Sequence, residues 1–283
     1  MTFAKRRSYL NYLVKAICSF SLPFLALLVS IAALGCSRNP EQNYLKSGDR
    51  LAGSSDVKRL EAALVEYKKA LVLNPESIAI KEKVALVNGK LGKELVRQEM
   101  WNEAIVKLEE SLEIKPNIAN NRYYLALAYV NKARIDSSPT SSIDRAIEEY
   151  KKAIGLEPES RYYTGLAIAY YHKDRKLIDQ AIAACREAIA KDPQYPHAHA
   201  VLGRMLAEKG ELEAALGYYR RAALLAEKTD RNEAAGYYDA LGDIYSLMGN
   251  SLRAKEARDK ASELRAKVRR TRRGLGPAPT NRR

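Results

Sequence analysis

Apolar and small residues recur along most of the chain at intervals of three and four, the spacing of helices that bury one face. Four segments follow one template and end at proline: residues 61–75, 102–116, 144–158 and 179–193. Each carries two small residues on one helical face: Ala63 and Ala70, Ala104 and Ser111, Ala146 and Ala153, and Ala181 and Ala188. Small side chains let helices approach closely, and proline ends each helix because it cannot donate the next hydrogen bond.

A second pattern precedes these segments and consists of a large, a small and another large residue. It occurs as Leu91-Gly92 with Leu95, Leu125-Ala126 with Tyr129, Leu166-Ala167 with Tyr170, Leu202-Gly203 with Leu206, and Leu241-Gly242 with Tyr245. A looser copy is Gly48 with Leu51. The two patterns together predict a chain of helical pairs.

These paired patterns resemble the tetratricopeptide repeat, a helical hairpin of about 34 residues. Residues 196–227 fit it most closely. The resemblance implies an all-α fold, a right-handed superhelix or α-solenoid of about six hairpins. We expect them at about residues 41–75, 76–116, 117–158, 159–193, 194–227 and 231–268, with each hairpin packed only against its neighbours.

The departures from the repeat carry their own predictions. Pro75, Pro116, Pro158 and Pro193 lie 41, 42 and 35 residues apart. The first spacing exceeds the repeat length of about 34 residues. This excess predicts a helix lengthened by two turns, from Ser77 to about residue 99. The second predicts an exposed loop over residues 136–142. Residues 251–265 are charged nearly all round, as expected of a terminal cap whose outer face meets water.

Charge is concentrated at the two ends. The chain has 48 Lys and Arg against 34 Asp and Glu. Residues 1–35 hold four basic residues and residues 265–283 hold eight, with no acidic residue in either segment. The body between them is therefore nearly neutral. This distribution argues against a nucleic-acid-binding face along the whole surface.

Residues 1–35 have the form of a secretory signal. Basic residues up to Lys15 precede an uncharged apolar run over residues 16–34, and a polar stretch follows Cys36. Residues 32–36, AALGC, resemble the lipobox of bacterial lipoproteins, in which the cysteine is acylated. We expect Cys36 to anchor the protein to a membrane through residues 36–40. An uncleaved signal anchor and ordinary cleavage remain alternatives, as does twin-arginine export.

By the same resemblance, Ser37 implies that the protein is located at the periplasmic face of the outer membrane. In a cell without an outer membrane, it would be anchored to the cytoplasmic membrane. Cys185 would then be the only thiol of the mature chain, and we expect it to be buried. The chain lacks glycine-rich phosphate loops, paired-cysteine metal spacings and the motifs of common hydrolases. His197 and His199, two positions apart, point in different directions on a helix. We expect no catalytic centre, no metal and no cofactor.

The resemblance implies a concave groove, lined by the first helix of each hairpin, that receives an extended peptide or a helix of a partner protein. It assigns to this groove Asn120, Tyr123, Leu127, Asn131, Arg161, Thr164, Ile168, Tyr171, His172, His197, Arg204, Glu208, Asp239 and Asp243. Tyrosine suits such a surface because it combines a large apolar face with one polar tip. Some of these tyrosines equally suit the core of a hairpin.

The basic end forms a second candidate surface. It comprises Arg265, Lys267, Arg269, Arg270, Arg272 and Arg273, and we expect a disordered tail over residues 269–283. It suits an anionic lipid or an acidic partner, whereas base stacking is unlikely because no aromatic residue interleaves with it. A merely solubilising tail is the alternative.

The overall plan resembles that of lipoproteins that assist type IV pilus or secretin assembly. We therefore expect a membrane-anchored adaptor for an envelope machine. It is similar also to adaptors for cell-wall hydrolases, outer-membrane protein insertion or polysaccharide export. A hypothesis of a different class is a signal-anchored regulator on the cytoplasmic side, tethered by its polybasic tail.

Overall fold

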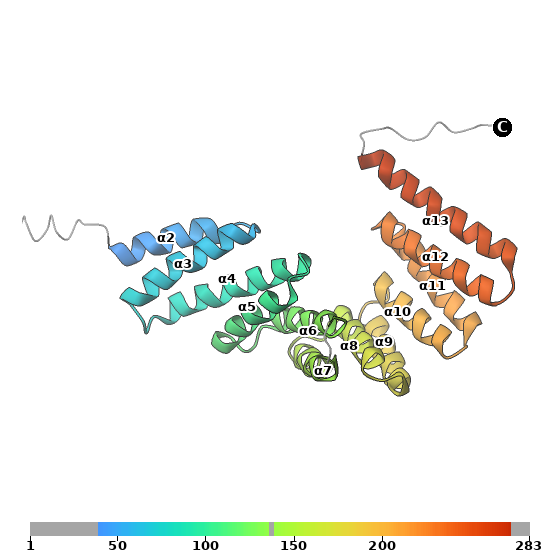
Figure 1. Cartoon of the computed structure of the whole chain (residues 1–283), viewed down its shortest axis with the longest axis horizontal. Coiled ribbons are helices and arrows are strands. Elements are labelled where there is room, and N and C mark those ends of the chain that lie inside the picture. Colours follow the sequence, from blue (N-terminus) through green and yellow to red (C-terminus); the bar gives the residue numbers. More distant parts are fainter. Residues whose placement is uncertain (1–38, 136–138, 273–283) are drawn as a thin grey trace, which may run out of the picture.

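The computed structural model describes residues 39–135 and 139–272. Over these residues the chain forms twelve α-helices and one 3-10 turn, with no strand (Figure 1). The helices are α2 (Pro40–Ala52), α3 (Val57–Leu73), α4 (Ile78–Arg97), α5 (Trp101–Ile114), α6 (Ala119–Ala133), α7 (Pro139–Leu156), α8 (Ser160–Lys173), α9 (Ile178–Lys191), α10 (Pro196–Glu208), α11 (Leu212–Ala226), α12 (Arg231–Leu247) and α13 (Ser251–Arg272). The predicted all-α fold of six hairpins is confirmed.

Several helix boundaries follow from local chemistry. The side chains of Asp56, Ser77 and Asp230 accept hydrogen bonds from backbone N–H groups in the first turns of α3, α4 and α12, which satisfies donors that have no partner within the helix. Pro196 opens α10, where its missing N–H costs nothing. The four proline-ended segments become α3, α5, α7 and α9.

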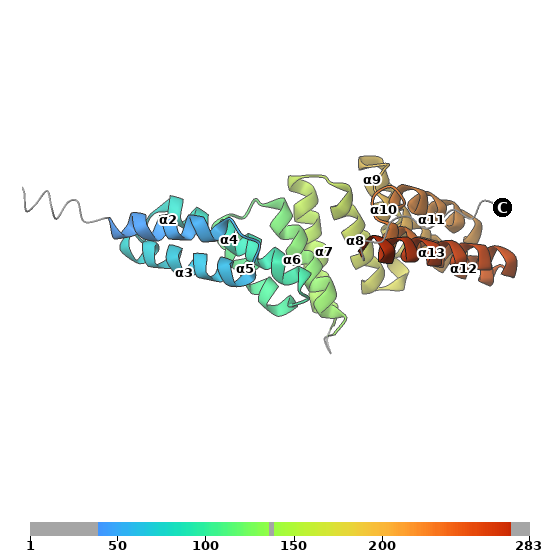
Figure 2. The same cartoon turned by 90° about the horizontal axis from the view of Figure 1, so that it is seen from above.

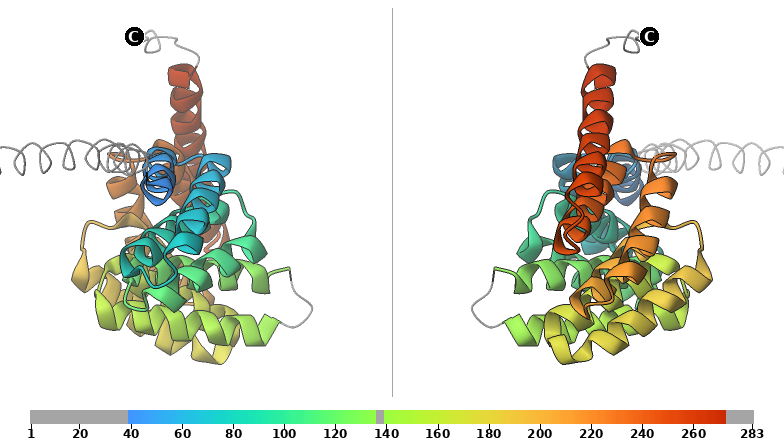
Figure 3. Two further views of the ribbon diagram at one scale, coloured as in Figure 1. Left: turned by 90° about the vertical axis from the view of Figure 1, so that its left-hand side faces the viewer. Right: turned by 90° about the vertical axis from the view of Figure 1, so that its right-hand side faces the viewer.

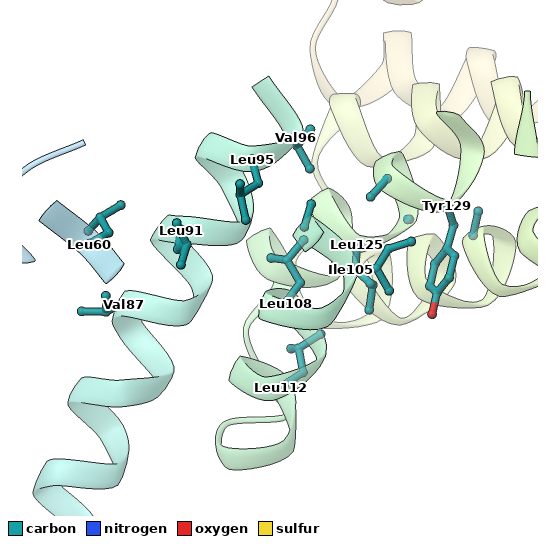
Figure 4. Packing of buried hydrophobic residues seen from close by; sticks show 14 of the residues in the cluster. Leu60, Val87, Leu91, Leu95, Val96, Ile105, Leu108, Leu112, Leu125 and Tyr129 are labelled. Atoms are coloured by element: carbon teal, nitrogen blue, oxygen red, sulfur yellow. The ribbon is translucent and has the colours of Figure 1, made fainter. Parts of the chain in front are cut away.

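The apolar core between the paired helices comprises one large cluster from α2 to α8 (Figure 4), a second from α8 to α13, and two smaller ones. Figure 4 shows Leu91 and Leu95 of α4 beside Leu108 of α5. Glycine makes the closest approaches possible. A Cβ added at Gly92 would lie 2.5 Å from Leu108, and one at Gly165 would lie 2.4 Å from the buried ring of Tyr150. Gly92, the small residue of the large-small-large pattern, therefore sets the distance between the two helices of its hairpin, whereas Gly165 sets the distance between α7 and α8 of successive hairpins.

The hairpins stack into an open arc. In Figure 1 the chain descends from α2 to α7 and rises again to α13, and Figure 2 shows the same elements spread along the long axis. The first helices of successive hairpins touch one another from α4 through α6 and α8 to α10, whereas the principal contacts of the second helices are to first helices. The first helices thus form the inner row of the arc.

The lengthened helix predicted after Ser77 is present, because α4 runs from Ile78 to Arg97 and is 20 residues long. The prediction of a loop over residues 136–142 is wrong for residues 139–142. Helix α7 begins at Pro139, and Ser142 is buried within it, because proline is tolerated in the first turn of a helix. Residues 136–138 lie outside the described part of the chain.

The prediction that a disordered tail begins at residue 269 is also wrong. Helix α13 continues to Arg272 and projects beyond the rest of the array (Figure 3). Ala254, Ala257, Ala261 and Leu264 form its buried stripe, while its other faces are charged, as expected of a cap. The predicted signal segment, Cys36 and Arg273 lie outside the described residues. Within the described ranges, no helix is long and apolar enough to cross a membrane.

Candidate functional site: the inner groove

Aromatic and charged side chains gather on the inner row at the centre of the arc. Tyr123 of α6 packs against Tyr162 of α8, with 5.2 Å between the ring centroids. The guanidinium carbon of Arg161 lies 5.3 Å from the ring centroid of Tyr123. Its Nε donates to Glu159 at 2.6 Å. The half-buried ring of Tyr123 is therefore held between the core and a cation.

The row continues onto α10. Tyr195 immediately precedes that helix, and its ring lies 6.2 Å from the imidazole of His197. Burial raises the pKa of the Tyr195 hydroxyl, and the neighbouring Tyr123 and Glu233 raise it further. Tyr195 thus stays neutral and links the surfaces of α6, α10 and α12.

Between α10 and α12 the groove deepens into a hollow of about 460 Å³, lined by His197, Ala200, Val201, Arg204, Tyr219, Asn232, Glu233, Gly236, Tyr237 and Ala240. Tyr237 donates to Glu233, and its oxygen lies 3.5 Å from Nδ1 of His197. Burial lowers the pKa of His197, and Arg204 lowers it further, although Glu233 opposes them. The hollow therefore presents a neutral imidazole and phenol beside one carboxylate and one guanidinium.

A second cluster joins α8 to α10. Tyr171 donates to Glu208 at 2.7 Å, and its ring centroid lies 4.0 Å from Arg175 and 5.3 Å from Arg204. Burial lowers the pKa of the neighbouring His172, as do Arg204 and Arg134. Tyr171 is buried, so the cluster joins the two hairpins and offers mainly Arg204 and His172 to the groove.

The structure corrects three of the predicted groove residues. Thr164 is only 1% exposed, and its hydroxyl donates to Ser160 of its own helix at 2.8 Å, so it cannot contact a partner. Asp239 and Asp243 face α13, where they pair with Arg265 and Arg258. No seventh hairpin follows α12 within the described residues, so the cap helix takes the side on which these carboxylates lie.

The remaining predicted residues on α6 and α8 are half-buried. Leu127 and Ile168 pack against the core, and Asn131 donates to the backbone oxygen of Leu127 at 2.9 Å. Six buried polar atoms have no hydrogen-bond partner among the described residues, and two of them belong to predicted groove residues: Oδ1 of Asn120 and Nε of Arg204. The groove thus holds one unfilled acceptor and one unfilled donor.

Sequence reasoning missed Tyr195, Glu233 and Tyr237. A signal was present for the latter two, because Asp230 is a good N-cap residue and starts α12 one turn earlier than α6, α8 and α10 start, relative to its Leu241-Gly242 pair. That extra turn carries Glu233 to the groove. His199, in contrast, is buried and bonds to the backbone oxygen of Pro193.

At the basic end, Lys267 pairs with Glu263 at 2.5 Å and Arg265 pairs with Asp239. The charge of α13 is thus partly neutralised. Arg269 is exposed, and Nε of Arg270 is buried without a partner among the described residues. Across the same residues, no three His, Cys, Asp or Glu side chains are grouped so that they could hold a metal ion.

Comparison with known proteins agrees with this architecture. Residues 140–196 and 174–232 match a model of the tetratricopeptide repeat family. A thermophilic tetratricopeptide repeat protein of Thermus thermophilus is 22% identical, and the match covers 71% of this chain and 98% of that one, with a TM-score of 0.50. MamA of Desulfovibrio magneticus RS-1 is 18% identical over 65% of this chain and 96% of its own, with a TM-score of 0.50.

The Cut9–Hcn1 hetero-tetramer of the APC/C gives a TM-score of 0.55 at 19% identity, over 72% of this chain and 43% of the matched chain. Identities this low show the fold alone. No curated protein matches the sequence. The chain therefore has the tetratricopeptide repeat fold, with the repeats themselves matched over residues 140–232.

Proposed function

We propose that this chain, which carries tetratricopeptide repeats over residues 140–232, is a non-catalytic scaffold. It binds an extended segment or a helix of a partner protein along the inner faces of α6, α8, α10 and α12. The observation that carries this proposal is the continuous row of half-buried Tyr123, Arg161, Tyr195, His197 and Tyr237. Tyrosine and arginine supply much of the binding energy in protein interfaces, and fixed rings lose little conformational entropy on binding.

The polar atoms of the groove favour an extended segment. Its backbone would offer hydrogen bonds to the half-buried side chains of Asn120 and Arg204. The hollow between α10 and α12 can receive one apolar or aromatic side chain beside Val201 and Tyr237. A segment with polar backbone contacts and one large side chain fits this surface.

Photo-crosslinking tests the assignment. A photoreactive residue placed at position 197, in the groove, is expected to capture the partner in cells. The same residue at position 224, an exposed site on the second helix α11, is the matched control. Arg161→Ala and Tyr237→Ala should each reduce recovery of the captured partner by about tenfold, the cost of truncating an interface hot spot of about 1.4 kcal/mol or more. Equal capture from positions 197 and 224 would place the interface elsewhere.

We further propose that the scaffold is exported and anchored through an acylated Cys36, and that it acts in assembly of an envelope machine such as a type IV pilus or a secretin. The support is the sequence of residues 32–36 followed by an array of repeats. Mass spectrometry of Cys36→Ala tests the anchor. A lipoprotein loses its lipid mass and its membrane attachment. A variant that stays membrane-bound at unchanged mass would favour the signal-anchored regulator.

A further inference from the structure

Tyr245 of α12 lies where two hollows meet, on a different face of α12 from the groove. The hollows have volumes of about 400 and 360 Å³ and lie between α11, α12 and α13. Both are lined by Arg220, Tyr245 and Arg253. The three side chains therefore stand at the middle of one elongated depression.

Two guanidinium groups converge on this tyrosine. The guanidinium carbons of Arg220 and Arg253 lie 5.8 and 5.9 Å from the centroid of its ring. Arg220 also donates to the Tyr245 hydroxyl. Neither arginine pairs with a carboxylate anywhere in residues 39–135 or 139–272. Each of these two cations lacks a carboxylate partner, so an anion within reach of both would be stabilising.

The same arrangement, with its anion present, occurs where the second hairpin meets the third. Tyr129 occupies the position of Tyr245 in the large-small-large pattern. It donates to Glu109 at 2.5 Å and accepts from Arg145 at 3.0 Å. The guanidinium of Arg145 lies over its ring at 5.6 Å.

The register of the repeats makes this comparison direct. Glu109 follows Leu108 as Arg220 follows Tyr219, and Arg145 precedes Ala146 as Arg253 precedes Ala254. The carboxylate on α5, in the second hairpin, is thus replaced by an arginine on α11, in the fifth hairpin. One position carries a complete cation–phenol–carboxylate set, and the other lacks the carboxylate.

We propose that the depression around Tyr245 binds the carboxylate of an Asp or Glu side chain in a protein partner, placed between Arg220 and Arg253. Arginine offers paired donors in the geometry that a carboxylate matches. Leu216, Leu241 and Met248 line the hollows and can cover apolar residues that flank the acid. This surface is separate from the inner groove, so an experiment that refutes binding at one of them leaves the proposal for the other intact.

The local charge favours a carboxylate over a phosphate. Glu213 and Glu256 line the two hollows. Lys260 adds a third cation, whose Nζ lies 3.9 Å from Glu227. Counted with Glu213, Glu256 and Glu227, the three cations leave no net positive charge, so a doubly charged phosphate would be repelled more strongly at the rim than a singly charged carboxylate.

The test compares two matched probes on the full chain in detergent. The Nε–Hε resonances of arginine are followed by NMR during titration with acetyl-Leu-Glu-Leu-amide or with acetyl-Leu-Gln-Leu-amide. The glutamate peptide should shift the resonances of Arg220 and Arg253 and saturate them. The glutamine peptide should bind at least about tenfold more weakly, because it lacks the charge-assisted hydrogen bonds.

Two substitutions exchange the sites. Arg220→Glu places a carboxylate beside Tyr245, as Glu109 is placed beside Tyr129, so the variant should fold with an unchanged or higher melting temperature. It should bind the glutamate peptide at least about tenfold more weakly. Glu109→Arg should create a second binding site at Tyr129. Equal binding of the two peptides, or unchanged binding in Arg220→Glu, would overturn the proposal. Tighter binding of inorganic phosphate than of the glutamate peptide would overturn the choice of carboxylate.

Discussion

Replacing Ser111 with alanine should destabilise the array, although alanine stands at the same template position in α3, α7 and α9. The hydroxyl of Ser111 donates to the backbone oxygen of Ala85 at 2.6 Å and accepts from the Asn121 amide at 2.9 Å. It thereby ties α5 to α4 and α6. Asn121 is buried, so no water replaces the lost acceptor.

The magnitude follows from that unpaired amide. A buried donor without a partner costs about 2 kcal/mol, and the better helix propensity of alanine offsets about 0.5 kcal/mol. The net loss is about 1.5 kcal/mol, or roughly 4 °C in melting temperature for a chain of this size. Denaturant titration followed by circular dichroism measures it. Ser262→Ala, on the exposed face of α13, is the control and should stay within about 0.5 kcal/mol of wild type.

A double-substitution cycle isolates the pair. In the Ser111→Ala background, Asn121→Ala should cost about 1 kcal/mol less than it does alone, because the amide has already lost its acceptor. Additive losses, or a Ser111→Ala variant as stable as wild type, would show that the hydrogen bonds do not stabilise this junction.

Three further outcomes can be measured on the same protein. Gly165→Ala should cost about 1–3 kcal/mol through overpacking against Tyr150, whereas Gly217→Ala, which meets open space within α11, should stabilise by about 0.5–1 kcal/mol in denaturant titration. Because the pKa of His197 is lowered in the folded state, its contribution is complete above the unfolded pKa of about 6.5 and is lost as pH falls. His197→Gln should therefore flatten the decline in melting temperature between about pH 8 and pH 5. Burial raises the pKa of the Cys185 thiol to about 12, so iodoacetamide at neutral pH should label it only as fast as the protein opens.

Much of the fold could be predicted because each repeat contains residues that mark where its helices end and where they pack. Proline and the small residues marked the helices directly, and the place of the first excess, before Leu91-Gly92, fixed the length of α4. The loop over residues 136–142 failed for a local reason. Pro139 can end a helix or begin one, and the serines around it did not distinguish the two.

The groove was harder to predict because its residues depend on neighbours that the repeat register does not name. The register assigned Tyr123, Arg161 and His197 to the inner row, where they are half-buried. It also assigned Thr164 and Asp239 there. Thr164 is enclosed by packing, and Asp239 is claimed by the cap helix that follows α12. The carboxylate missing beside Tyr245 became visible only when two hairpins were compared in three dimensions.

The abutting first helices of the inner row give the arc a one-sided mechanical response. Their side chains are already in contact from α4 to α10, and packed protein interiors compress very little. Further curling would force these helices into each other, whereas straightening only loosens their contacts. The array should therefore stretch more easily than it compresses along its inner edge. A bound segment that is longer than the groove should flatten the arc, whereas a shorter one should leave its curvature unchanged.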